Sequence, residues 1–206
     1  MRVFCVLLAF LSLILSAATV QAADPVGKVV RLQATAQAIT QQGTRALNSG
    51  DPVFNNDRLV TGPDARLEVS LLDDSSLTLG GNAEFIISEL DLTPGTEAGN
   101  MELLKGAFLL VTGTIAKVAS ERYRVSTPYA TIGIRGTTFW GGPLDDPFSV
   151  LLLDGEIEVR NPGGSVILKP NQGTDIAAPD AKPEAPGAWS DDKRNRAFAT
   201  ITFSEN

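Results

Sequence analysis

Residues 127–140 have the most distinctive sequence in the chain: Thr127-Pro128-Tyr129-Ala130-Thr131-Ile132-Gly133-Ile134-Arg135-Gly136-Thr137-Thr138-Phe139-Trp140. The apolar, β-branched and aromatic residues in this stretch are typical of an extended segment. Two glycines interrupt it, which predicts that the backbone bends or closely approaches a neighbour at Gly133 and Gly136. The stretch therefore indicates the core of a β-rich domain rather than a catalytic centre.

Short alternating segments separated by Gly, Asn and Asp lie on both sides of this stretch. In residues 65–72 the apolar side chains alternate with polar ones, which predicts a strand with one buried face. Residues 148–153 are apolar enough to be buried on both faces, and Asp154-Gly155 after them is a hairpin signal. No stretch before Pro179 offers a long helix with caps at both ends. Residues 23–176 therefore predict an all-β domain of many short strands, and a sandwich, a barrel and an irregular β-solenoid are all compatible with it.

The composition changes after Ile176. Residues 177–188 contain prolines among small and charged residues, which predicts a Pro-rich surface linker. Residues 189–206 form a short C-terminal appendage, with Trp189 as its apolar anchor. Ser190-Asp191-Asp192 favours a helix through N-terminal capping, whereas the alternation in residues 197–203 favours a strand.

The first 22 residues have the three parts of a signal peptide. Arg2 supplies the basic end, residues 3–18 are apolar, and Val20 and Ala22 are small residues before a cleavage site. An uncleaved membrane anchor is the alternative, because the apolar run is only slightly shorter than a spanning helix. We expect cleavage after Ala22, a periplasmic or extracellular location, and no stable membrane span afterwards.

The composition excludes several classes of site. The 206-residue chain has no histidine, and its single cysteine, Cys5, lies in the predicted leader. A Ser-His-Asp triad, a disulfide framework, a cysteine nucleophile and a cysteine-based metal site are therefore excluded. The formal net charge is −7, which argues against a nucleic-acid partner. The sequence predicts no catalytic, cofactor-binding or metal-binding residue.

Three groups of residues are candidate sites. Arg135 predicts a partly buried hydrogen-bonding hub that binds turn carbonyls or a carboxylate, and its alternative role is a partner contact. Tyr129 and Trp140 are further candidate partner contacts, as part of a sugar-stacking platform, although such aromatics more often fill a β core. Acidic turn residues raise calcium binding as an alternative to simple turn formation, and these residues are Asp51, Asp57, Asp64, Asp73 and Asp74.

Residues 125–139 resemble the signature of the FecR domain, in which Val-x-Thr-Pro precedes a few small apolar residues and then Ile/Val-Arg-Gly-Thr-x-Phe. The residues that carry the resemblance are Thr127, Pro128, Gly133, Ile134, Arg135, Gly136, Thr137 and Phe139. Weaker matches extend the resemblance over residues 26–176. One departure is Asp73-Asp74-Ser75, where the family commonly has Asp-Gly-Ser, and both sequences favour a turn.

The resemblance implies a periplasmic β domain of a signal regulator. The family's founding members carry a cytoplasmic segment that contacts a sigma factor and one membrane span, and in this chain the predicted leader takes their place. We therefore expect a non-catalytic binding or scaffold module that senses or relays a cell-envelope signal through an envelope protein partner. A polysaccharide- or peptidoglycan-binding module is the alternative, and the oligomeric state is left open.

Overall fold

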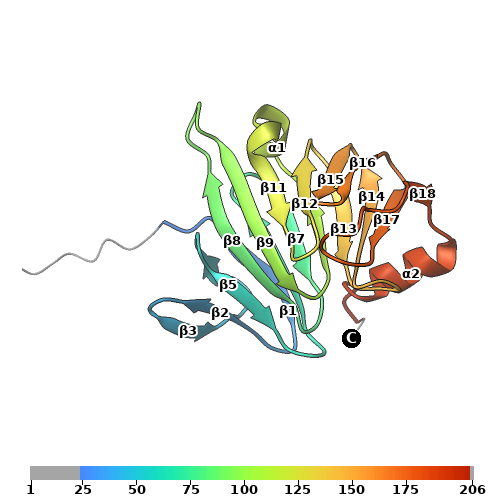
Figure 1. Cartoon of the computed structure of the whole chain (residues 1–206). Helices are drawn as coiled ribbons and strands as arrows, with labels where there is room; N and C mark the ends of the chain where they lie inside the picture. Colours follow the sequence, from blue (N-terminus) through green and yellow to red (C-terminus); the bar gives the residue numbers. More distant parts are fainter. Residues whose placement is uncertain (1–23, 205–206) are drawn as a thin grey trace, which may run out of the picture.

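The computed structural model describes residues 24–204, and the predicted leader lies outside them. Most of this chain forms two nine-stranded sheets that lie face to face (Figure 1). Sheet A has the order β18 (Gly187–Ala188), β17 (Gln172–Ile176), β14 (Phe148–Asp154), β13 (Thr138–Gly142), β10 (Phe108–Val111), β7 (Ser76–Leu79), β6 (Arg66–Leu71), β1 (Gly27–Gln33) and β4 (Pro52–Val53). Sheet B has the order β16 (Gly164–Leu168), β15 (Ile157–Asn161), β12 (Thr131–Ile134), β11 (Tyr123–Ser126), β9 (Ala98–Lys105), β8 (Glu84–Asp91), β5 (Arg58–Thr61), β2 (Ala36–Thr40) and β3 (Gly43–Ala46).

The all-β prediction is confirmed, and the arrangement is two packed sheets that do not close into a barrel. Strand β6 illustrates how a sheet packs on its partner. Its alternate residues are buried, as the sequence of residues 65–72 predicts. Side chains from the two inner faces meet between the sheets. Phe108 of sheet A lies 5.5 Å from Phe85 of sheet B, measured between ring centroids, and 5.4 Å from Phe139. Burial of these apolar faces is the main favourable contribution to folding.

The stretch at residues 127–140 does not form one extended segment. Its first half is β12 in sheet B and its second half is β13 in sheet A, so the chain crosses between the sheets at residues 135–137. Gly136 has a φ of +64°, a conformation that favours glycine, and the predicted bend is confirmed there. The expectation for Gly133 is wrong, because a Cβ at this position would have nothing within 4 Å.

Helical structure in the described chain is short. Helix α1 (Ile115–Val118) and the 3₁₀ turn η1 (Ser120–Arg122) connect β10 to β11, and α2 (Asp191–Ala199) follows β18. The appendage is therefore a helix rather than a strand, and the Ser190 hydroxyl accepts a hydrogen bond of 3.2 Å from the backbone N–H of Lys193 as its cap. Within residues 24–204, no helix has both the length and the apolar character needed to cross a bilayer.

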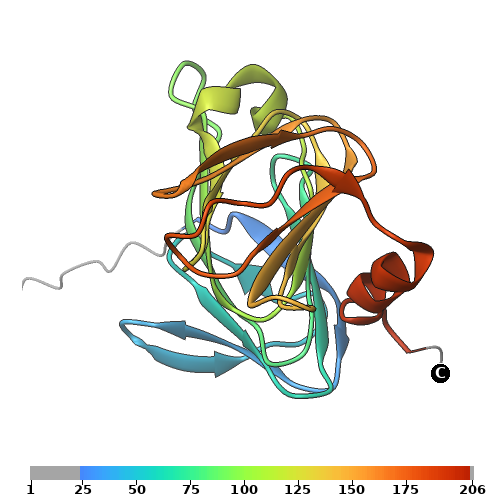
Figure 2. The ribbon, with the colours of Figure 1, turned by 45° about the vertical axis from the view of Figure 1, so that its right-hand side comes forward.

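The segment predicted as a linker, residues 177–188, lies against the edge of sheet A. The backbone N–H of Glu184 donates to the carbonyl of Asp175 over 3.0 Å, and the Thr174 hydroxyl donates to the carbonyl of Glu184 over 2.8 Å. Pro183 is buried, and β18 at the end of the segment pairs with β17. Figure 2 shows this segment passing beside the two sheets before it reaches α2.

Candidate functional site

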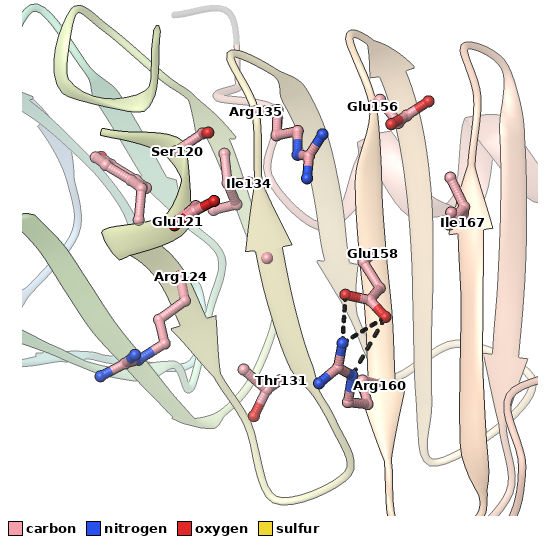
Figure 3. Close-up of a pocket in the computed structure, with 12 residues that line it drawn as sticks. Ser120, Glu121, Arg124, Thr131, Ile134, Arg135, Glu156, Glu158, Arg160 and Ile167 are labelled. Carbon is pink, nitrogen blue, oxygen red and sulfur yellow. Dashed lines mark hydrogen bonds and ion pairs between the residues drawn. The ribbon is translucent and has the colours of Figure 1, made fainter. Parts of the chain in front are cut away.

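The two sheets differ in what lies on their outer faces. On sheet A, residues 189–204 cover an apolar area in which Trp140 and Leu151 are completely buried. The indole N–H of Trp140 donates to the Thr200 hydroxyl over 3.0 Å, and Trp189 meets the same ring edge-to-face at 6.0 Å. The outer face of sheet B instead presents exposed charged side chains: Arg124 on β11, Arg135 directly after β12, and Arg160 on β15 (Figure 3). This open polar face is the candidate site.

A groove of about 490 Å³ lies on this face, between η1 and β16. The strand register places Arg124, Gly133, Glu158 and Ile167 in one row across β11, β12, β15 and β16. Because Gly133 has no side chain and nothing lies within 4 Å of its Cβ position, the row has a gap between Arg124 and Glu158. The glycine thus forms the floor of the groove, and its role is to leave space.

Arg135 lies at the end of β12, on the rim of this groove (Figure 3). Its side chain is exposed, and its guanidinium has no hydrogen bond or ion pair with any residue between 24 and 204. The predicted role as a partly buried hub is therefore wrong. The exposed position leaves the donors of Arg135 directed at solvent, where a partner can accept from them.

The turn that follows Arg135 is fixed from the other sheet. The backbone N–H of Thr137 donates to the Thr112 hydroxyl over 2.6 Å, and the Thr112 N–H donates to the Thr137 carbonyl over 2.9 Å. Ile134 and Phe139 on either side are completely buried. Buried residues therefore fix both ends of the turn. Arg135, which lies between them, points outward.

Thr127 and Pro128 shape the opposite end of β12. The Thr127 hydroxyl accepts hydrogen bonds from the N–H groups of Tyr129 at 3.1 Å and Ala130 at 2.9 Å. This is the local side-chain hydrogen bonding that favours threonine in turns. The Thr127 hydroxyl therefore holds the turn between β11 and β12.

The charges in the groove are partly paired. Glu158 and Arg160 form a two-pronged ion pair in which the Arg160 Nη2 lies 2.8 Å from each carboxylate oxygen. Arg124 is exposed, and within residues 24–204 its guanidinium has no ion pair. Sequence reasoning did not single out Arg124, Glu158 or Ile167. The alternation of residues in β11, β15 and β16 indicates that these three side chains point outward. It does not indicate that the three residues lie in one row across the sheet.

The two aromatic residues predicted as partner contacts, Trp140 and Tyr129, lie outside the groove. Trp140 is completely buried beneath the C-terminal segment, so the expectation that it contacts a partner is wrong for this structure. Tyr129 is half-buried and stacks on Phe148, with ring centroids 5.9 Å apart and an interplanar angle of 3°. Neither ring lines the groove that holds Gly133 and Arg135.

Two of the acidic turn residues, Asp57 and Asp73, have structural partners. Asp57 is completely buried, pairs with Arg45, and accepts a hydrogen bond of 2.9 Å from the N–H of Phe54. Asp73 accepts from the hydroxyl of Ser75 over 2.8 Å, and burial raises the pKa of the Asp73 carboxyl above its ordinary value. Among residues 24–204, no three His, Cys, Asp or Glu side chains gather as a metal site.

Comparison with family models finds a match to the part of the chain that holds this geometry. The family model described as FecR protein matches residues 57–158, which is narrower than the predicted span. A search of curated proteins finds no match. The match to FecR protein includes β12, the crossing turn and the groove floor.

Two crystal structures of a candidate anti-sigma factor from Parabacteroides distasonis ATCC 8503, at 1.65 and 2.50 Å resolution, have a similar fold. Their TM-scores are 0.52 and 0.53, each at 16% sequence identity over 67% of this chain. The match covers 62% of the length of those proteins, and at this identity it shows the fold alone. Residues 57–158 of this chain, which include the Ile-Arg-Gly-Thr-x-Phe motif and the strands that hold it, match the family model of the FecR protein.

Proposed function

We propose that this chain is a non-catalytic binding module of the cell envelope that regulates signalling by contacting a protein partner in the periplasm. The match of residues 57–158 to the FecR family model supports a regulatory role. The similar solved structures are of a candidate anti-sigma factor, and we extend a signal-regulating role to this chain by analogy with them. The predicted leader supports export.

One observation carries the assignment of the contact surface. Arg135 belongs to the family motif, yet its side chain is exposed on the rim of a groove and has no bonding partner in the described chain. Arginine is one of the residues most often responsible for binding energy at protein interfaces, because its planar guanidinium donates several hydrogen bonds at once. We therefore assign Arg135 and the floor at Gly133 to the partner surface.

Glycan binding is the weaker candidate. The large apolar side chains that are exposed in residues 24–204 are aliphatic: Val30, Leu72, Leu92, Val111, Val118 and Ile167. The aromatic residues of the motif are buried or stacked within the fold. A sugar would therefore find no exposed ring to stack on in this part of the chain.

The test uses residues 23–206 as bait for proteins in an envelope extract, with Arg135→Glu as the variant. Lys28→Glu is the control, because it makes the same charge change at an exposed position on sheet A. We expect saturable capture of a protein that Arg135→Glu removes and Lys28→Glu retains. Retention on isolated peptidoglycan alone, unaffected by Arg135→Glu, would instead support the glycan module and contradict the proposed surface.

A further inference from the structure

Residues 189–204 cover a second apolar cluster, which lies on the outer face of sheet A and is separate from the core between the sheets. The strand register places a row of four residues across β10, β13, β14 and β17 on this face: Leu109, Trp140, Leu151 and Gly173. The covering segment adds Trp189, Phe198 and Ile201 to the cluster. The structure therefore shows both an apolar face and the segment that it holds.

The backbone of sheet A leaves room for this segment at two glycines. A Cβ on Gly173 would lie 2.4 Å from the Trp189 ring. A Cβ on Gly80, directly after β7, would lie 2.5 Å from the Thr200 carbonyl oxygen. Because a larger residue at either position would collide with the segment, the face fits it both at Trp189 and at Thr200.

The face also carries acidic groups that match the cations of α2. Asp175 on β17 accepts a hydrogen bond of 2.6 Å from the Ser149 hydroxyl, and its other carboxylate oxygen pairs with Lys193. Asp145, in the loop after β13, accepts from two guanidinium nitrogens of Arg196 at 2.6 and 3.1 Å. Two carboxylates of sheet A and its loop are therefore placed to receive two cations of one helix.

The end of the helix is bound by a residue of the same sheet. The Arg66 Nη2 on β6 donates to the Ala199 carbonyl over 3.0 Å. The last carbonyls of a helix have no partner within the helix, so a donor at this position favours one direction of the helix axis. The face thus selects a helix by its apolar side, its cations and its direction.

Helix α2 is only shallowly embedded in this face. Of its nine residues, Ala197 alone is buried. The side chains that join Arg196 to Asp145 are 45% and 48% exposed, and ion pairs at such positions stabilise a contact only slightly. A segment with few buried apolar contacts opens at a lower cost in free energy than global unfolding. Because the core between the sheets is a separate cluster, it stays packed when the segment leaves.

We propose that the outer face of sheet A is a docking site for a short helix of a protein partner, and that residues 189–204 occupy this site in cis until the partner helix displaces them. The partner helix carries apolar side chains for the row on sheet A, and Lys or Arg on the side that faces Asp145 and Asp175. Binding of an amphipathic helix on an apolar surface is a common mode of recognition. The site lies on the opposite sheet from the groove at Gly133, so it is a second surface and does not rest on the proposed function.

A labelled peptide of residues 187–204 is the probe for this face, and fluorescence anisotropy measures its binding to residues 23–206. The double variant Trp189→Ala/Ile201→Ala weakens the cover and leaves the face unchanged. We expect it to bind the peptide at least about tenfold more tightly than the parent chain, in which the cover competes for the site. Arg194→Ala is the control and should bind like the parent, because Arg194 lies on the same helix and forms no ion pair within residues 24–204.

A peptide that carries Lys193→Glu and Arg196→Glu tests the charge selectivity and should not bind. Failure of the folded double variant to bind the original peptide would overturn the docking site. Equal binding of both peptides would overturn the preference for cations, and equal binding by parent and double variant would show that the cover does not compete. Arg135→Glu should leave peptide binding unchanged, so this surface and the proposed partner surface can fail separately.

Hydrogen exchange measured by NMR tests the release of the cover in the parent chain. The Trp140 indole N–H, which donates to Thr200, should be less protected than the backbone N–H of Val150 in the core between the sheets. Asp145→Asn should speed exchange of the indole at least about twofold, because it removes a charge that holds α2. Asp146→Asn is the matched control, since the Asp146 carboxylate has no ion pair in the described chain, and it should have no effect. Equal protection of the two N–H groups would show that the cover leaves only on global unfolding, and would overturn displacement.

Discussion

At the level of single residues, Arg135 shows what a motif leaves undetermined. An arginine between two apolar segments is compatible with a buried hub and with an exposed contact, since both place it beside buried neighbours. The turn at Gly136 and the hydrogen bonds between Thr112 and Thr137 decide the outcome, because they fix which way residue 135 points. Those bonds join residues that are 25 apart in the sequence, and local pattern gives no sign of them.

Arg135→Ala should therefore leave stability almost unchanged. The side chain is exposed and its guanidinium has no bonding partner in the described chain, so we expect the free energy of unfolding to change by less than about 0.5 kcal/mol. Ile134→Ala, at a completely buried neighbour, should cost about 2–5 kcal/mol as the comparison. Chemical denaturation measures both. A loss of about 2 kcal/mol for Arg135→Ala would restore the role of a structural hub.

Asp73 gives a prediction about pH. Burial raises its pKa in the folded state, so the folded chain holds the proton more tightly than the unfolded chain does. The resulting contribution to stability is present at low pH and is lost as the pH rises above about 4 through the raised folded pKa. Relative to the parent chain, Asp73→Asn should therefore gain in free energy of unfolding as the pH rises through this window. A difference that stays constant with pH, measured by urea denaturation, would contradict the shift.

At the level of elements, the C-terminal helix shows where sequence pattern is ambiguous. Residues 189–206 support a helix through their cap and a strand through their alternation, and the Ser190 cap with Asp191 and Asp192 in the first turn favours the helix. Trp189 was predicted as its anchor. The surface that receives it was not, because Trp140 and Gly173 come from two strands that are distant in the sequence.

Gly173→Ala should weaken the packing of the C-terminal helix segment on sheet A. A Cβ at Gly173 would lie 2.4 Å from the Trp189 ring, so we expect a loss of about 1–3 kcal/mol and a changed near-UV circular dichroism signal from Trp140 and Trp189, the only two tryptophans in the chain. Gly187→Ala is the matched control, because its nearest contact is at 4.0 Å. Equal effects of the two substitutions would show that Trp189 is not packed on Gly173.

For the whole molecule, sequence pattern predicts the strands better than their order. Residues 65–72 and 148–153 match β6 and β14 because alternation and apolar runs are local properties. The placement of β10 between β7 and β13, and the parallel pairing of β9 with β11, depend on contacts between distant segments. The same limit applies to the groove, whose row of residues joins four strands. Only the sheet order shows that Gly133 lies between Arg124 and Glu158.

The central claim is that the face of sheet B around Gly133 binds a protein partner. Gly133→Val tests it most directly, because a Cβ at this position would meet nothing within 4 Å and the larger side chain would take up space in the groove. Valine is favoured over glycine in strands by up to about 1 kcal/mol, so the melting temperature should not fall. We predict that the folded variant, used as bait, loses the envelope protein that the parent chain captures. Capture at the parental level by folded Gly133→Val would contradict the claim.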